Sequence, residues 1–153
     1  MAYTITSDHE VGHWVAKRIR GGYFEERSQA LGLLKDDEIV AGVIYENWNH
    51  QSIVCHIAIE GRITPAYLAA IFDYPYNVMQ VEKIIVPVAS CNNESLWLVM
   101  GMGFQEEARI KNAHPQGDLI FLTLERDKGR FPHERYAKRI EHGKRQSSAA
   151  CRT

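Results

Sequence analysis

The segment covering residues 86–104 constrains the fold of this chain more than any other stretch. It continues an apolar, β-branched run that includes Ile84 and Ile85, which predicts a buried strand. Apolar residues then recur at helical spacing up to Gly103 and Phe104, which predict the helix end. A strand that ends where a helix begins exposes backbone N–H groups at its carboxyl end, where open α/β sheets bind ligands. We therefore expect the functional site at the polar residues of this junction, which are Ser90, Asn92, Asn93 and Ser95.

The remainder of the chain predicts a mixed sheet flanked by helices. Alternating or apolar runs predict strands at residues 3–6, 31–34, 39–48, 51–60, 81–88, 106–111 and 118–126. Helical spacing predicts helices within residues 7–20, 64–72, 96–102 and 131–144. The strands at 31–34, 39–48 and 51–60 form an antiparallel meander. A helix connects residues 51–60 to residues 81–88, so these two strands are expected to be parallel neighbours.

Two helix starts have specific signals. Ser7, followed by Glu10 three residues later, predicts a capping box at the first helix, and Gly21 is expected to end it. Thr64 is a good N-cap, and Pro65 suits the first helical position because its missing N–H has no partner there anyway.

Charge is divided unevenly along the chain. Residues 1–125 carry 9 basic and 16 acidic side chains, a net charge of −7, whereas residues 126–153 carry 9 basic and 3 acidic ones, a net charge of +6. We expect one domain over residues 1–131 and a basic C-terminal helix or tail over residues 132–153. This tail is a candidate for binding nucleic acid or an acidic protein; the alternative is a solvated terminus that rests on its own acidic domain.

The composition excludes several classes of protein. No apolar run approaches the roughly 20 residues that span a membrane, and the N-terminus lacks a basic region followed by an apolar core. We expect a cytoplasmic protein without a membrane partner. The cysteines form no Cys-x-x-Cys pair, so no metal site is expected.

Three motifs in the second half of the chain carry a family resemblance. Residues 71–76 are Ile-Phe-Asp-Tyr-Pro-Tyr, Asn92-x-x-Ser95 is followed by Gly-Phe-Gln-Glu-Glu-Ala-Arg-Ile-Lys at 103–111, and residues 112–118 form the next turn. Together with the order of elements, they resemble the branch of the GNAT acyltransferase superfamily with "iFdYpF" and "N-x-x-S…GF-x-x-EG-x-x-R" patterns. That branch includes phage-borne homologues.

The resemblance implies a fold and an activity. The fold is an α/β mixed sheet of six to seven strands, with an antiparallel meander, a parallel pair that splays, and about four flanking helices. The activity is transfer of an acetyl group from acetyl-CoA, the cosubstrate, to a primary amine of a small molecule or a protein. We expect this protein to be a monomer or a homodimer.

The family also implies where acetyl-CoA binds. Its thioester arm lies where the parallel strands part, beside Ile57 and Ile59, and its pyrophosphate lies at the start of the following helix, beside Gly61, Arg62 and Thr64. The family's glycine-rich Q/R-x-x-G-x-G/A loop is reduced to Gly61 here. Arg62 either pairs with the phosphates of acetyl-CoA through its guanidinium or is a surface arginine without a binding role. Asn92 contacts the pantetheine arm or caps a helix.

The candidate catalytic residues are His56, Glu60, Glu46 and Ser95. His56 is a candidate general base if it faces the acceptor and a structural histidine if it faces away. Glu60 and Glu46 are candidate general bases that would act through a bridging water. In the alternative interpretation they are solvated carboxylates without a catalytic role. Ser95 is a weak proton donor or a helix cap, and it matters because Val99 stands where the family has its acidic tyrosine.

Two other functions remain open on the sequence. The reduced glycine loop and Val99 are also typical of a GNAT-like protein that binds a partner without catalysis. A GNAT-like enzyme that modifies nucleobases, with the basic tail holding the nucleic acid, is the second alternative.

Overall fold

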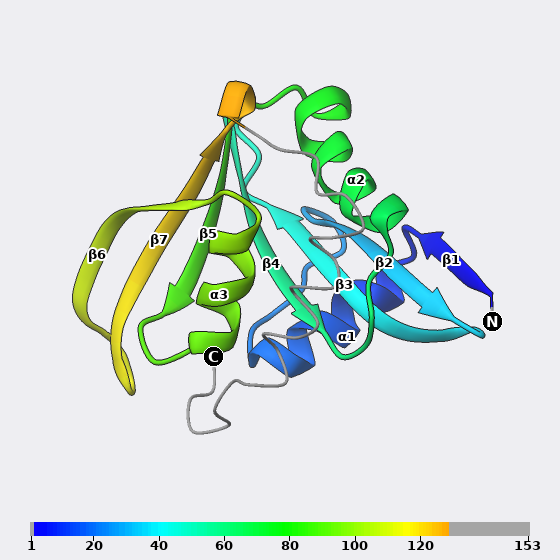
Figure 1. Ribbon diagram of the computed structural model, residues 1–153, viewed down its shortest axis with the longest axis horizontal. Helices are drawn as coiled ribbons and strands as arrows, with labels where there is room; N and C mark the ends of the chain where they lie inside the picture. The colour runs from blue at the N-terminus through cyan, green and yellow to red at the C-terminus, as the bar shows by residue number, and fades with distance from the viewer. Residues whose placement is uncertain (1, 129–153) are drawn as a thin grey trace.

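The computed structural model describes residues 2–128, which form one seven-stranded sheet flanked by helices (Figure 1). The elements in chain order are β1 (Tyr3–Thr6), α1 (His9–Ile19), β2 (Gln29–Lys35), β3 (Glu38–Glu46), β4 (Ser52–Ile59), α2 (Pro65–Asp73), a π-helical turn (Tyr74–Val78), β5 (Lys83–Ala89), α3 (Asn93–Gly101), β6 (Gln105–His114), β7 (Gly117–Glu125) and a 3₁₀ turn (Arg126–Lys128).

The sheet has the strand order β1-β2-β3-β4-β5-β7-β6. Strands β1 to β4 form an antiparallel meander, β4 and β5 are parallel, and β5, β7 and β6 are antiparallel again. This confirms the predicted mixed sheet and its parallel pair. The described residues contain three α-helices, where about four were expected. The fourth, at 131–144, and the basic tail at 132–153 lie outside the described residues.

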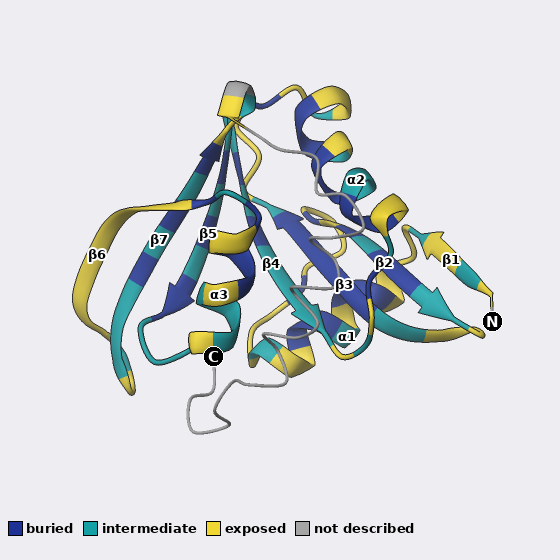
Figure 2. Ribbon diagram, in the orientation of Figure 1, coloured by how far each residue is buried: buried dark blue, intermediate teal, exposed yellow. Residues whose placement is uncertain are grey.

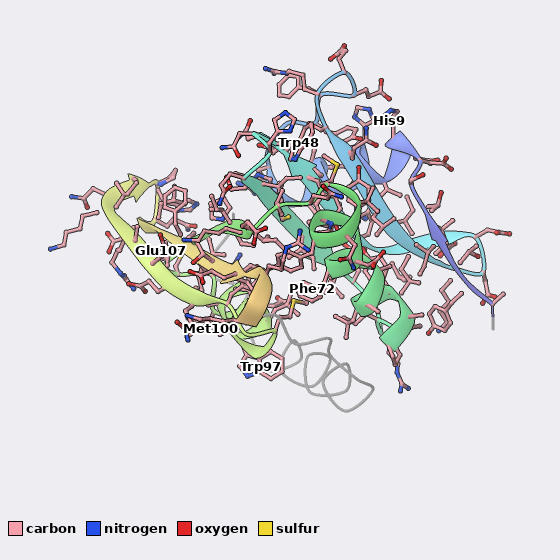
Figure 3. The ribbon with its side chains drawn as sticks, turned by 90° about the horizontal axis from the view of Figure 1, so that it is seen from above. His9, Trp48, Phe72, Trp97, Met100 and Glu107 are labelled. Atoms are coloured by element: carbon pink, nitrogen blue, oxygen red, sulfur yellow. The ribbon has the colours of Figure 1, made fainter. Side chains whose placement is uncertain are left out.

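The helices cover both faces of the sheet. Helix α1 packs on one face, where Val11 and Val15 form a small core with Ile44 of β3. Helices α2 and α3 pack on the other face and bury the larger core (Figure 1). Figure 3 shows the same division, with His9 of α1 on one side of the sheet and Trp97 and Met100 of α3 on the other. No helix within residues 2–128 is long and apolar enough to cross a membrane.

The start of α1 differs from the predicted capping box. Its N-cap is Asp8, whose side chain makes no capping hydrogen bond, and the helix begins at His9. The helix ends at Ile19, two residues before the predicted glycine, because Arg20 takes a left-handed conformation (φ 56°) and donates its N–H to the Ala16 carbonyl. A capping role for Ser7 is therefore a wrong prediction, although the helix itself is confirmed.

The start of α2 is as predicted. The Thr64 side chain accepts a hydrogen bond from the Tyr67 N–H at 3.1 Å, and Pro65 is the first helical residue. The predicted break after Phe72 is instead a continuation into a π-helical turn. The Tyr76 hydroxyl in this turn donates to the Leu124 carbonyl at 2.7 Å, which ties the turn to β7.

Not all large aromatic side chains belong to the core. Phe72 and Phe104 are buried in it. Trp97 and Trp48 are 39% and 43% exposed. Trp97 belongs to α3, whereas Trp48 lies in the loop between β3 and β4, where its Nε1–H donates to the Met79 carbonyl at 3.2 Å.

Candidate functional site

The parallel strands β4 and β5 part soon after they begin. Their pairing covers Ser52 to Val54 on β4 and Lys83 to Ile85 on β5, and it stops there. Strand β4 continues to Ile59 while pairing with β3, and β5 continues to Ala89 while pairing with β7. The predicted wedge between the two strands is therefore confirmed.

Pro87 lies in the part of β5 beyond the pairing. A proline has no N–H to donate, so a strand paired on both sides tolerates it poorly, whereas a strand with one open edge accepts it. Pro87 is thus a signal for the parting that the sequence analysis did not use.

A cavity of about 300 Å³ occupies the wedge. Its walls come from six elements and from the turn after α1. The lining residues are Ile19 and Gly21, His56 and Ile57 of β4, Val86 to Ala89 of β5, Ser95 and Val99 of α3, His114 of β6 and Leu119 of β7. A smaller apolar cavity of about 30 Å³ adjoins it and shares Ile57, Val86 and Val99.

Side chains from both faces of the sheet line the larger cavity. Ile57 packs with the core under α2 and α3, whereas His56, its neighbour in the strand, points to the opposite face because side chains alternate along a strand. His56 is paired across the sheet with Ile44, which packs under α1. The wall of the cavity therefore includes Ile57 from the α2/α3 face and His56 from the α1 face.

His56 has a carboxylate beside it. Its Nε2 lies 3.5 Å from Oε2 of Glu46 on the adjacent strand β3, and both side chains are largely buried. This contact favours a proton on Nε2 and leaves the lone pair on Nδ1. The structure thus brings together two of the four predicted catalytic residues.

Glu60 lies elsewhere. Both of its carboxylate oxygens bind Arg18 of α1, at 2.7 and 3.2 Å, and Glu60 is exposed at the end of β4. It does not line the cavity. The ion pair therefore connects the end of β4 to α1, and the Glu60 carboxylate is not directed into the wedge.

Solved structures share the architecture described above. The spermidine/spermine N-acetyltransferase SpeG of Vibrio cholerae, in a mutant form, aligns with a TM-score of 0.67 at 16% identity, over 83% of this chain and 96% of that chain. The N-acetyltransferase PseH of Campylobacter jejuni, in complex with acetyl coenzyme A, aligns with a TM-score of 0.58 at 14% identity, over 82% and 99%. The chain has the GNAT fold. No model of a protein family matches the sequence, and no curated protein matches it significantly.

The start of α2 follows the end of β4 in the chain, and few backbone N–H groups are available as donors there. Pro65 has no N–H, and the Tyr67 N–H is already bound by the Thr64 side chain. The exposed Ala66 still offers its N–H in this turn. Arg62 is exposed near this turn, and at Gly61 a side-chain carbon would lie 3.1 Å from Val40.

Helix α3 supplies the far wall of the wedge. Asn92 accepts the Ser95 N–H at 3.1 Å, so its side chain serves as the helix cap, and it does not line the cavity. Ser95 and Val99, one turn apart, do line it. Val99 is buried, and among the described residues that line the cavity Ser95 alone carries a hydroxyl.

A buried phenol and a buried thiol lie near the wedge, and neither is suited to catalysis. Tyr45 borders the smaller cavity, and its hydroxyl donates to the Ile71 carbonyl at 2.7 Å. Burial raises its pKa well above the ordinary value. Burial also raises the pKa of the Cys55 thiol, with a smaller contribution from Glu46, so this thiol is not an activated nucleophile.

His114 is a cavity residue that sequence reasoning missed. It ends β6 after an irregularity in the β6–β7 register between Ile110 and His114, and it lies opposite Gly117. The family resemblance included residues 112–118, but strand periodicity gives no sign that this hairpin reaches the wedge.

No three His, Cys, Asp or Glu side chains come together as a metal site within residues 2–128.

Proposed function

We propose that this protein transfers an acetyl group from acetyl-CoA to a primary amine. The observation that carries the proposal is the parting of β4 and β5, with a cavity between them that is lined from both faces of the sheet. Direct transfer between two substrates suits such a cavity, because the amine must reach the face of the thioester carbonyl while each substrate keeps its own binding surface.

The α2/α3 face suits the donor. The thioester arm would lie along the open edge of β4 beside Ile57 and Ile59, whose strand has backbone groups without a β5 partner beyond Val54. Arg62, Gly61, Thr64 and the first turn of α2 would hold the phosphates, through a guanidinium and backbone N–H groups. Asn92 would act by capping α3 and so positioning Ser95 at the wall.

The α1 face suits the acceptor. His56 points to this side and takes a proton from the attacking amine at Nδ1, while Glu46 orients the ring and stabilises the imidazolium that results. The amine nitrogen forms a bond to the carbonyl carbon, and the carbon–sulfur bond breaks with the electron pair leaving on sulfur. The proton held by His56 then passes to the thiolate or to water. Ser95 is a candidate hydrogen-bond donor to the sulfur.

Titration of the full chain with acetyl-CoA tests donor binding. Micromolar binding by calorimetry, together with acetylation of amines from a panel of polyamines, aminosugars and peptides, would support the proposal. A chain that binds no acetyl-CoA at millimolar concentration would refute it and favour a GNAT-fold protein that binds a partner. Acetyl-CoA-dependent modification of a nucleobase in DNA or RNA, without amine acetylation, would favour the nucleobase alternative.

A pair of glycine variants tests the assignment of the two faces. Gly21 lines the cavity on the α1 side, and its neighbour Gly22 does not; both are exposed. We expect Gly21→Trp to lower amine acetylation at least about tenfold because the indole blocks the acceptor, while acetyl-CoA binding is kept. Gly22→Trp is the matched control and should leave both unchanged. Equal transfer rates in the two variants would contradict the assignment.

A further inference from the structure

We infer that His114 is a catalytic hydrogen-bond donor in this cavity, stabilising the negative charge that develops on the thioester during acyl transfer. This inference rests on the proposed acetyl transfer and adds a residue that the family resemblance does not assign. The need for such a donor follows from Val99, which leaves the wall of α3 without the family's phenol.

The hydrogen bonding of His114 specifies its tautomer. Its Nδ1 accepts the backbone N–H of Gln116 at 3.1 Å, so Nδ1 carries a lone pair. A neutral imidazole then carries its proton on Nε2, where it is a donor. A doubly protonated ring would direct an N–H of its own against the Gln116 N–H. The contact therefore favours a neutral ring, which donates a hydrogen bond from Nε2 and does not release its proton.

The hairpin that carries His114 is held against the cavity. The Ser90 hydroxyl at the end of β5 accepts the Asp118 N–H at 2.9 Å, and the Ser90 N–H donates to the Asp118 carbonyl at 2.9 Å. The Asp118 carboxylate in turn accepts the Asn112 N–H at 3.1 Å and pairs with Arg109 at 3.2 Å. These bonds join the turn directly to the strand that forms one wall of the wedge.

The two imidazoles of the cavity have complementary tasks. His56 faces Glu46 through Nε2 and offers a lone pair at Nδ1, whereas His114 is held through Nδ1 and offers a proton at Nε2. During transfer His56 accepts the proton of the amine, and His114 keeps its own proton. A neutral imidazole is a poor acid, but its N–H stabilises charge on an oxygen or sulfur in a water-poor site.

The tautomer can be measured without any turnover. In long-range ¹H–¹⁵N NMR of the ¹⁵N-histidine-labelled full chain at pH 7.5, the ring whose signals are missing from the spectrum of His114→Asn should have Nε2 protonated and Nδ1 unprotonated. A His114 ring that is protonated at Nδ1, alone or together with Nε2, would overturn the inference.

Two substitutions of His114 distinguish hydrogen-bond donation from Nε2 from the structural role of Nδ1 as acceptor of the Gln116 N–H. An Asn side chain at 114 places its oxygen near Nδ1 and keeps an acceptor for the Gln116 N–H, but it has no donor at the Nε2 position. A Gln side chain reaches the Nε2 position with an NH₂ donor. We expect His114→Asn to lower kcat about 10²-fold with little change in the Kd for acetyl-CoA, and His114→Gln to recover much of that loss.

The outcomes distinguish this inference from the proposed function. Unchanged kcat in His114→Asn, or an equal loss in both variants, would remove the donor role from an enzyme that still acetylates amines. A wild-type chain without acetyl transfer would remove the proposed function and the catalytic role together, whatever the NMR spectrum shows.

Discussion

His56 and Ile57 are adjacent in the chain but serve opposite faces of the sheet. Ile57 packs toward α2 and α3, and His56 points toward α1 with Glu46 at 3.5 Å. A shift of one residue in the β4 register would exchange them and would put an imidazole into the apolar core. The packing of Ile53 and Cys55 in that core therefore also determines where the candidate base lies.

We expect His56→Gln to lower kcat by about 10²- to 10³-fold, because the amine loses its proton acceptor. Acetyl-CoA binding, measured by calorimetry, should stay unchanged, since the ring points to the other face. His13→Gln is the matched control, as His13 is exposed on α1, and its rate should equal that of the wild type. A His56→Gln enzyme with normal kcat would assign the base elsewhere.

Position 117 requires a glycine for two reasons: its backbone conformation, and the lack of room for a side chain. Its φ is 150°, and a side-chain carbon there would lie 2.6 Å from the Ser90 hydroxyl oxygen. We expect Gly117→Ala to destabilise the fold by about 1–3 kcal/mol in urea unfolding, because Ser90 must release the Asp118 N–H. Gly101→Ala, with nothing within 4 Å, should be neutral or slightly stabilising. Equal stability of the two variants would contradict this account of the turn.

At the scale of elements, the β6–β7 hairpin has little core of its own. Every residue of β6 before His114 is exposed (Figure 2). Its inner side is held by polar contacts, among them Glu107, which accepts from Lys83 at 2.9 Å and from Thr123 at 2.7 Å. Strand β6 of this hairpin therefore depends on hydrogen bonds and charge, whereas β7 packs Ile120, Leu122 and Leu124 into the main core.

This dependence predicts a pH effect through Asp118. The Asn112 N–H and then Arg109 hold the pKa of its carboxyl below the ordinary 3.8. A carboxylate with a lowered pKa in the folded state stabilises that state above about pH 4, and the contribution is lost as the pH falls through the folded pKa. Asp118→Asn should therefore lower the urea midpoint at pH 7 and match the wild type more closely near pH 2.5.

Glu38→Gln is the control for this series. Glu38 is exposed at the start of β3, and its substitution should not change the pH dependence. A gap between Asp118→Asn and the wild type that widens in acid would have the wrong sign for the proposed contacts.

At the scale of the whole molecule, the wedge exists because each of its strands is held from the outer side. Strand β4 is paired with β3, and β5 is paired with β7 along its full length. Arg18 of α1 binds Glu60 at the open end of β4, and Ser90 ties the end of β5 to the hairpin. The sheet can therefore stay parted between β4 and β5 without collapsing, which preserves the cavity.

Much of this architecture could be predicted from the sequence. The order of elements, the parallel crossover between β4 and β5 and the start of α2 at Thr64 all depend on local patterns: periodicity, connection length and a capping residue. The presence of Pro87 even marks the strand that loses a partner, since a missing N–H is a property of the residue itself.

Only the tertiary structure decided which side chains meet. The pairing of β4 and β5 ends at Val54 and Ile85. His56 contacts Glu46, and Glu60 forms an ion pair with Arg18. His114 lines the cavity although it belongs to a hairpin that is distant in the chain. These contacts join residues that are far apart in the chain or on different strands, and their distances depend on sheet twist and register. Local propensities do not contain that information, because it arises when the whole sheet packs between its two layers of helices.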